Sequence, residues 1–202
     1  MVHIEHKADC CGCRACEQSC PCSAISIKKD KEGFLYPKVD ESLCIGCGLC
    51  EKSCPVIKPS NATLPLECFA AVSRNEEIRR NSSSGGVFSE LAEFVIKEGG
   101  VVFGVAFNER FLVSHIMVSN LEDLKQLRGS KYLQSDTGNT FTLCKEFLDN
   151  GVPVLYSGTP CQISGLRHFL KKEYSNLLLV DVICHGVPSP DVWKKYLEGK
   201  IN

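Results

Sequence analysis

The chain has 202 residues, of which 44% are hydrophobic and 23% are charged, and its formal net charge is −1. This composition excludes a wholly disordered or a collagen-like chain. No apolar run approaches the roughly 20 residues of a membrane helix, and the first residues have no apolar stretch of the signal-peptide type. The near-neutral charge gives no reason to expect a nucleic acid or a membrane as a partner. We therefore expect a cytoplasmic protein with one α/β domain, or with a small domain joined to a medium one.

Cysteine is the unusual residue, because 14 cysteines occur beside only two methionines and one tryptophan. Ten of the 14 lie between Cys10 and Cys54. A disulfide framework is typical of short exported chains, and this chain has no export signal. The clustering therefore favours thiols that bind metal in a reducing compartment.

Two copies of the pattern C-x2-C-x2-C-x3-C-P make up the N-terminal part, residues 1–58, and they begin 34 residues apart. Each copy predicts a short helix, near residues 14–19 and 48–53, which the proline closes. Between the copies, apolar and polar residues alternate over 24–28 and 34–39, which predicts two short strands. The repeated cysteines are Cys10, Cys13, Cys16 and Cys20 in the first copy, and Cys44, Cys47, Cys50 and Cys54 in the second.

This spacing is typical of cysteines that bind 4Fe-4S clusters, since thiolate is the soft anionic ligand that iron accepts there. The triplet C-x2-C-x2-C wraps three corners of one cube, and the fourth cysteine points at the other cluster. The pattern therefore predicts two clusters that exchange their fourth ligands. The expected ligand sets are Cys10, Cys13, Cys16 and Cys54 for one cluster, and Cys44, Cys47, Cys50 and Cys20 for the other.

Zinc is the main alternative, because it also accepts four thiolates. Zinc sites usually use two separated C-x2-C pairs, so the repeated triplet favours iron–sulfur clusters, and disulfides are a lesser alternative. Cys11 and Cys22 are additional thiols beside expected ligands. We interpret them as bystanders, although either could replace its neighbour in a remodelled site. Residues 1–58 resemble the bacterial two-cluster ferredoxins, which implies electron transfer and names no substrate.

The charge of this N-terminal module predicts the kind of partner that it meets. Residues 1–60 contain eight basic and eight acidic residues. Two oxidised clusters with their thiolates would bring the module to a net charge of about −4. Such a module suits docking to a basic patch on an electron donor or acceptor, so we expect a redox partner protein.

Residues 59–65 contain two prolines and small polar residues, which predicts a linker. Strand and helix signals then alternate over 66–202, and a hairpin at 111–118 predicts a mixed sheet. The fold class is therefore a small α+β ferredoxin-like domain followed by an α/β domain. Strands are expected at 68–72, 101–107, 111–118, 152–156 and 177–183, and helices at 87–97, 121–127, 141–148, 160–170 and 190–197.

Polar and reactive residues lie where two of these helices begin. Residues 81–87 place serines and glycines before a helix, which indicates either a cradle for a flavin phosphate or a plain helix cap. Thr159 and Pro160 are a good N-cap and first residue of a helix, so Cys161 lies in its first turn. At this position the sequence leaves three interpretations of Cys161 open: a nucleophile, a metal ligand or a small buried residue.

Cys184 and His185 follow the strand at 177–183, and ligands of open α/β sheets bind outside the carboxyl ends of strands. His185 could be a ligand, an acid or base, or a polar residue satisfied by hydrogen bonds. The pattern G-x-G-x-x-G is missing, so nothing indicates a standard nicotinamide site. Cys68 and Cys144 lie in apolar contexts and are expected in the core.

Four motifs occur in order along the second part, at residues 83–89, 129–135, 158–162 and 183–189. They read SSGGVFS, GSKYLQS, GTPCQ and ICHGVPS. With the cysteine repeats, they resemble the family of beta subunits of coenzyme F420 hydrogenases and dehydrogenases, in particular the bacterial members with a fused two-cluster ferredoxin. The resemblance covers essentially the whole chain. It implies a flavin-type second domain that binds FAD and exchanges electrons with the clusters.

The resemblance also implies site residues in the second domain. Those expected near the flavin are Ser84, Gly85, Gly86 and Lys131. A third 4Fe-4S cluster would take Cys161 and Cys184, with its other ligands from a C-x2-C pair further along. No such pair follows Cys184 here, so a third cluster is expected only if the protein continues into one.

Members of the family continue past Asn202, so we expect an N-terminal fragment or a shortened reading frame with an incomplete flavin domain. The expected function is an iron–sulfur and flavin oxidoreductase, or its electron-transfer subunit. The alternatives are a ferredoxin-like module without a catalytic site of its own and a zinc-stabilised structural protein. The sequence leaves the substrate open among a deazaflavin, another small molecule and a redox protein.

Overall fold

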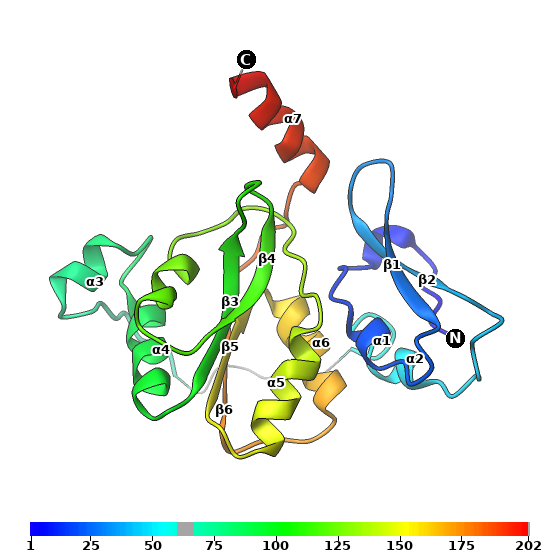
Figure 1. The fold of residues 1–202 in the computed structure, drawn as a ribbon, viewed down its shortest axis with the longest axis horizontal. Helices are drawn as coiled ribbons and strands as arrows, with labels where there is room; N and C mark the ends of the chain where they lie inside the picture. The colour runs from blue at the N-terminus through cyan, green and yellow to red at the C-terminus, as the bar shows by residue number, and fades with distance from the viewer. Residues whose placement is uncertain (60–66, 202) are drawn as a thin grey trace.

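The computed structural model describes residues 1–59 and 67–201. Figure 1 shows a small N-terminal module beside a larger part that is built on a sheet, with the last helix projecting from the sheet. Apart from residue 59, the predicted linker at 59–65 lies outside the described residues. None of the helices described in the structure is both long and apolar enough to cross a membrane.

The N-terminal module is a two-stranded sheet with one short helix in each cysteine motif. Its elements are η1 (Lys7–Asp9), α1 (Ala15–Gln18), β1 (Ile25–Lys29), β2 (Leu35–Val39) and α2 (Leu49–Lys52). The strands pair antiparallel, with Ile25 opposite Val39. Asp30 closes the hairpin because its carboxylate accepts hydrogen bonds from the backbone N–H groups of Glu32 and Phe34. The two predicted strands and the two predicted helices of this part are therefore confirmed.

The second part is a four-stranded mixed sheet with helices on both faces. Its elements are α3 (Glu76–Arg80), α4 (Val87–Lys97), β3 (Val101–Phe107), β4 (Val113–Val118), η2 (Asp123–Leu127), α5 (Thr140–Asp149), β5 (Val154–Gly158), α6 (Pro160–Leu170), β6 (Leu177–Asp181) and α7 (Pro190–Ile201). The strand order is β4-β3-β5-β6. β3 and β4 are antiparallel, whereas β3, β5 and β6 are parallel, so the predicted mixed sheet is confirmed.

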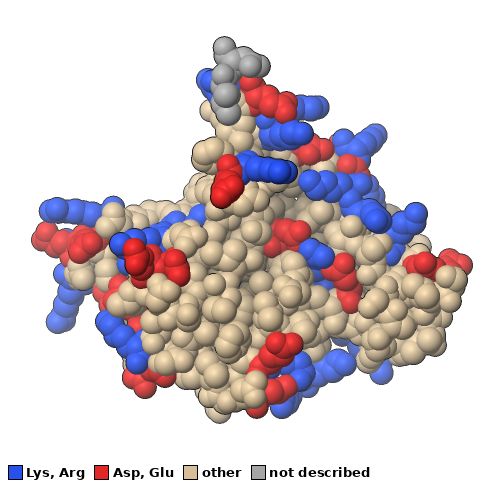
Figure 2. All heavy atoms as spheres, viewed as in Figure 1, with Lys and Arg blue, Asp and Glu red and all other residues tan. Residues whose placement is uncertain are grey.

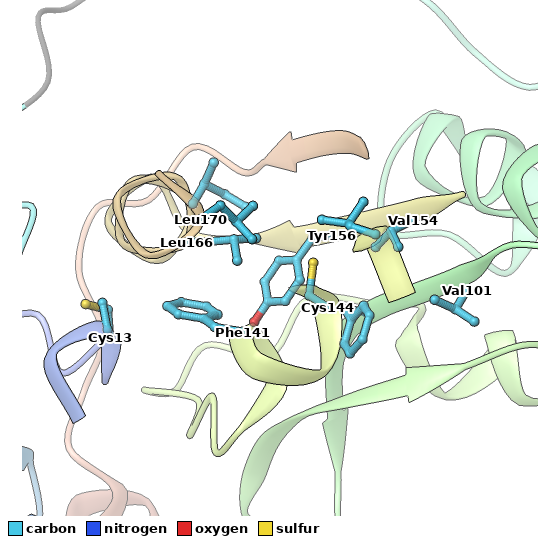
Figure 3. Close-up of a cluster of buried hydrophobic side chains, with 12 residues drawn as sticks. Cys13, Val101, Phe141, Cys144, Val154, Tyr156, Leu166 and Leu170 are labelled. Carbon is cyan, nitrogen blue, oxygen red and sulfur yellow. The ribbon is translucent and has the colours of Figure 1, made fainter. Parts of the chain in front are cut away.

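Alternate residues of β3 and β5 face opposite sides of the sheet and form two cores. The core under α5 and α6 includes Val101, Phe103, Val154, Tyr156, Phe141, Cys144, Leu148, Ile163, Leu166 and Leu170. The core under α4 and η2 includes Val102, Ala106, Leu155, Ala92, Val95, Leu124 and Leu127. Cys13 and Ala15 of the N-terminal module belong to the first core, and Figure 3 shows Cys13 at its edge. The module therefore packs on the side of the sheet that α5 and α6 cover.

The strand predicted at 68–72 is wrong, because the described residues 67–73 contain no strand. Phe69 is 81% exposed and Cys68 is exposed, so the prediction of a core position for Cys68 is also wrong. The segment runs beside the loop before α4, where Ser73 N–H donates to the Gly85 carbonyl at 2.6 Å. A short apolar run indicates a strand only where a partner strand is available. Cys144 is fully buried, as expected.

The other differences lie at the ends of elements. The helix expected at 121–127 is a 3-10 helix that begins at Asp123. β4 begins two residues later than expected, after Phe111, whose φ of 55° is left-handed. β6 ends at Asp181, two residues earlier than expected, and Val182 and Ile183 beyond it are exposed. α3 has too short an apolar pattern to be predicted.

Candidate iron–sulfur centres and their surroundings

A pocket of about 340 Å³, open to solvent, lies between the two cysteine motifs. Cys44, Cys47 and Cys50 of the second motif line it together with Cys20 of the first motif. We call it the outer pocket. Cys22 also lines it, and its sulfur lies 3.7 Å from that of Cys20. The structure thus brings together one of the two ligand sets that the spacing predicts.

A second pocket of about 350 Å³, also open to solvent, is lined by Cys10, Cys13 and Cys16 of the first motif and by Cys54 of the second. We call it the inner pocket. It brings together the other predicted ligand set, and Cys11 also lines it. Across residues 1–59 and 67–201, no group of three or more His, Cys, Asp or Glu is arranged to hold a single metal ion.

Left-handed residues shape the loops around both pockets. Arg14 precedes α1 with φ 62°, and Gly48 precedes α2 with φ 70°. Gly12 and Gly46 hold the same conformation two residues earlier in each motif. Alternating conformations of this kind turn successive backbone N–H groups toward one side, which favours an anionic guest. At Gly12 a Cβ would lie 2.6 Å from Gln134 Nε2 and 3.0 Å from the Leu35 carbonyl oxygen, so a side chain there would displace Gln134.

The chemistry of the thiols fits a cationic iron–sulfur core. Burial, followed by repulsion from the neighbouring Cys10 and Cys54, raises the pKa of Cys16 to about 12. Burial also raises the pKa of Cys10. These two thiols of the inner pocket therefore resist ionisation, and bound iron would supply the positive charge that offsets this cost. In the outer pocket, Ala24 N–H donates to Cys20 Sγ at 3.3 Å, a contact of the kind that tunes cluster potentials.

The inner pocket faces the second part of the chain through a set of long-range hydrogen bonds. Thr137 Oγ1 donates to the Cys13 carbonyl at 3.0 Å and is fully buried. Gln134 accepts from Leu35 N–H at 3.2 Å. Arg14 forms an ion pair with Asp136. Residues 134–137 therefore hold the first cysteine loop against the second part, a contact that no pattern in the sequence predicts.

Helix α6 approaches the inner pocket most closely at Gly165, where a Cβ would lie 2.9 Å from Cys13 Sγ. At the start of the same helix, the Cys161 thiol lies 3.1 Å from Thr159 Oγ1 and interacts with the thiol of Cys11. The interaction with Cys11, followed by burial, raises the pKa of Cys161. The hydrogen bond with Cys13 raises the pKa of Cys11 to about 12. Cys11, interpreted from the sequence as a bystander, thus lies between a predicted ligand of the inner pocket and Cys161.

Cys184 and His185 are exposed, and Cys184 Sγ accepts a hydrogen bond from Gly186 N–H at 3.4 Å. Gly158 and Asp181 are paired at the carboxyl ends of β5 and β6. Cys161 and Cys184 each follow one of these strand ends by three residues, so both lie beyond the same edge of the sheet.

The residues expected near a flavin lie around the start of α4. Ser130 N–H donates to Ser83 Oγ at 3.0 Å, which joins the motifs at 83–89 and 129–135. Ser84 is exposed in the same loop. Lys131 donates to two backbone carbonyls, and burial lowers its pKa to about 8.

The two glycines before α4 are required by packing. A Cβ at Gly85 would lie 2.4 Å from the Ala71 carbonyl oxygen. Gly86 has φ 84°, a left-handed conformation that favours glycine. Because Gly86 has no side chain that could cap α4, the first backbone N–H groups of this helix are available to bind another hydrogen-bond acceptor. Hydroxyls, a lysine and free helical N–H groups are the donors that bind phosphate. The donor set thus fits a phosphate group chemically.

A buried polar network under these motifs was also missed from the sequence. His115 Nε2 donates to the Ser157 carbonyl at 3.1 Å, and Nδ1 accepts from Ser135 Oγ at 3.2 Å. Gln162 Nε2 donates to Ser135 Oγ at 2.9 Å, and its Oε1 accepts from Thr159 N–H. Burial lowers the pKa of His115 to about 4, so this imidazole stays neutral. His115 lies two residues after Val113 on β4, so both side chains point to the same buried side of the sheet. This alternation along the strand could have predicted that His115 is buried.

Three family models match the chain in succession. A 4Fe-4S dicluster domain matches residues 9–57. Residues 68–151 and 153–201 match the models for the N-terminal and C-terminal parts of the coenzyme F420 hydrogenase/dehydrogenase beta subunit. The chain belongs to the family of coenzyme F420 hydrogenase/dehydrogenase beta subunits. The resemblance drawn from the four motifs is confirmed, and the N-terminal module is an iron–sulfur domain of the 4Fe-4S type rather than a zinc or disulfide module.

Among the relatives in this family, one of the subunits of the F(420)H(2) dehydrogenase from Methanosarcina mazei is 27% identical over 197 residues. The match covers 90% of this chain and 54% of that protein, so the chain spans about half the length of the curated relative. The F420-reducing NiFe hydrogenase complex from Methanosarcina barkeri contains a chain with a TM-score of 0.49 and 19% identity. That match covers 63% of this chain and 47% of the other.

Proposed function

We propose that this chain relays single electrons through two 4Fe-4S clusters to or from an FAD, within an oxidoreductase or its electron-transfer subunit. One observation carries the proposal. Each pocket is lined by three cysteines of one motif and by the last cysteine of the other. Clusters of this type carry one electron each, and a flavin converts between one-electron and two-electron chemistry.

In this proposal the chain's own thiols hold the clusters. Cys20, Cys44, Cys47 and Cys50 bind one cluster in the outer pocket, and Cys10, Cys13, Cys16 and Cys54 bind the other in the inner pocket. The crossed arrangement ties the two motifs together, so neither cluster site is complete without both halves of the module.

The FAD part of the proposal rests on the donors before α4. Ser84 and the N–H groups that follow Gly85 and Gly86 would donate to a phosphate, with Lys131 contributing positive charge nearby. Cys161 and Cys184 would contribute to a third cluster only in a longer protein that supplies a C-x2-C pair. A redox partner protein and coenzyme F420, which the relative's name mentions, are the proposed partner and substrate.

A ferredoxin-like module without its own catalytic site is the second candidate, and a specific observation favours it. Lys131 already donates to the carbonyls of Gln126 and Arg128. Gly85 is explained by its contact with Ala71. These residues therefore have structural roles that need no flavin.

Purification without oxygen, followed by counts of iron, sulfide, zinc and flavin, separates the two candidates. We expect about eight iron atoms, about eight sulfides and one FAD in each chain. A full iron count without flavin would leave the electron-transfer module. Zinc in place of iron would refute both candidates.

A pair of variants tests the crossed ligands. Cys20→Ala, made together with Cys22→Ala so that the neighbouring thiol cannot replace it, should abolish the electron paramagnetic resonance signal of the outer pocket, although Cys20 belongs to the first motif. Cys22→Ala is the matched control, because its sulfur lies 3.7 Å from that of Cys20 and is not a proposed ligand. Loss of the inner-pocket signal in the double variant would show that the assignment is wrong.

A further inference from the structure

The two pockets differ in what covers them. In the inner pocket Cys13 and Cys54 are each 7% exposed, and the Cys13 side chain packs against Gly165 of α6. The outer pocket has Cys47 exposed. A Cβ added at Gly46 or Gly48 would meet no described atom within 4 Å, so another molecule has room to approach the backbone there.

Apolar side chains stand around the outer pocket although solvent surrounds them. Ile45 is 69% exposed and Leu43 is 51% exposed, and Ile45 lines the pocket itself. Met1 also lines it and is exposed. Exposed apolar groups gathered at one place indicate a contact surface. We call residues 43–48 the outer loop.

The charge next to the outer loop is acidic. Asp40 and Glu41 lie shortly before it, Glu41 is exposed, and residues 40–48 contain no Lys or Arg. The N-terminal ammonium of Met1, beside the pocket, is paired with Glu51. A bound cluster with four thiolates adds further negative charge at the same place. Figure 2 shows acidic side chains at the outer end of the N-terminal module, with basic side chains above them and a mostly uncharged surface below. An apolar centre with an acidic border is complementary to an apolar centre with a basic border.

We propose that the outer loop is the docking surface for an electron-transfer protein whose redox centre lies in an apolar face ringed by Lys and Arg. The inner pocket, clamped to α6, instead serves the second part of the same chain. This inference rests on the proposed function and adds the order of the two sites. One electron crosses at the outer loop between the two redox centres, and no proton moves with it.

Binding between oxidised proteins tests this surface without any turnover. The probe is cytochrome c, a basic one-electron haem protein, and the measurement is its Kd for the oxidised, iron-loaded full chain by calorimetry. Ile45→Ser should weaken binding by about fivefold to tenfold, because an exposed apolar anchor is lost. Leu43→Ser is a second variant, expected to act in the same direction.

Val192→Ser is the matched control, since Val192 is 60% exposed on α7 and should leave the Kd unchanged. Glu41→Lys should weaken binding at low salt, and the difference should vanish at high salt. Unchanged binding in Ile45→Ser and Leu43→Ser, each with a full iron count, would overturn the docking surface and leave the relay intact. If the wild-type protein, purified without oxygen, contained no iron, that result would instead overturn the proposed function.

Discussion

Replacing Gly165 by alanine tests how closely α6 holds the inner pocket. The added Cβ would lie 2.9 Å from Cys13 Sγ and 3.3 Å from Cys13 Cβ. Ordinary contacts begin near 3.4 Å, so the methyl group overlaps the sulfur by about 0.5 Å. The other side of α6 is packed into the core through Leu166 and Leu170, which are buried, so the strain falls on Cys13.

Two effects on stability oppose each other in this variant. Alanine favours a helix over glycine by about 1 kcal/mol, whereas overpacking costs about 1–3 kcal/mol. We expect the free energy of unfolding to fall by about 0–2 kcal/mol. The larger effect should be on iron, with a loss from about eight atoms toward about four as the inner cluster is displaced.

The assay combines iron counting with electron paramagnetic resonance of the reduced protein. Gly199→Ala is the control, because Gly199 lies in α7 and a Cβ there would meet no described atom within 4 Å. This control should keep all of its iron. Gly165→Ala with a wild-type iron count and an unchanged spectrum would refute the contact between α6 and a ligand of the inner cluster.

Three further predictions concern buried polar groups. Thr137→Val should lower the free energy of unfolding by about 1–3 kcal/mol in chemical denaturation, because the Cys13 carbonyl loses its partner. Tyr156→Phe should cost about 1 kcal/mol, since the buried hydroxyl lies 2.7 Å from Thr140 Oγ1; an equal midpoint would contradict this. His115 has a folded pKa of about 4, below its unfolded value, so its contribution is present above pH 6.5 and is lost as the pH falls toward 4. Between pH 7 and 4, wild type should therefore lose up to about 3 kcal/mol more than His115→Gln, and parallel stability curves would contradict it.

Local patterns in the sequence were enough to predict the strands and helices that carry the cysteine motifs. The strands at 25–29 and 35–39 follow from alternation over a few residues, and α1 and α2 from the spacing of cysteines before a proline. The run at 68–72 was also predicted as a strand from its apolar residues, and it forms none. Residues this close in the chain cannot specify whether a partner strand is present, so the same signal has two outcomes.

Other features of the site depend on residues more than 100 positions apart. Thr137 meets Cys13, and Gly165 makes room for the same cysteine. The neighbouring thiols of Cys11 and Cys161 were assigned separate roles from the sequence. Their meeting depends on how the module packs against α6, and no short-range pattern records that packing.

The chain by itself therefore determined the kind of metal chemistry, since the reach of three cysteines around one cube is set by short loops of fixed length. Only the tertiary structure decided which cysteine motif packs against α6 through Cys13 and which stands at the surface with Ile45. The two motifs have the same cysteine spacing, and their difference arises from what folds against each of them.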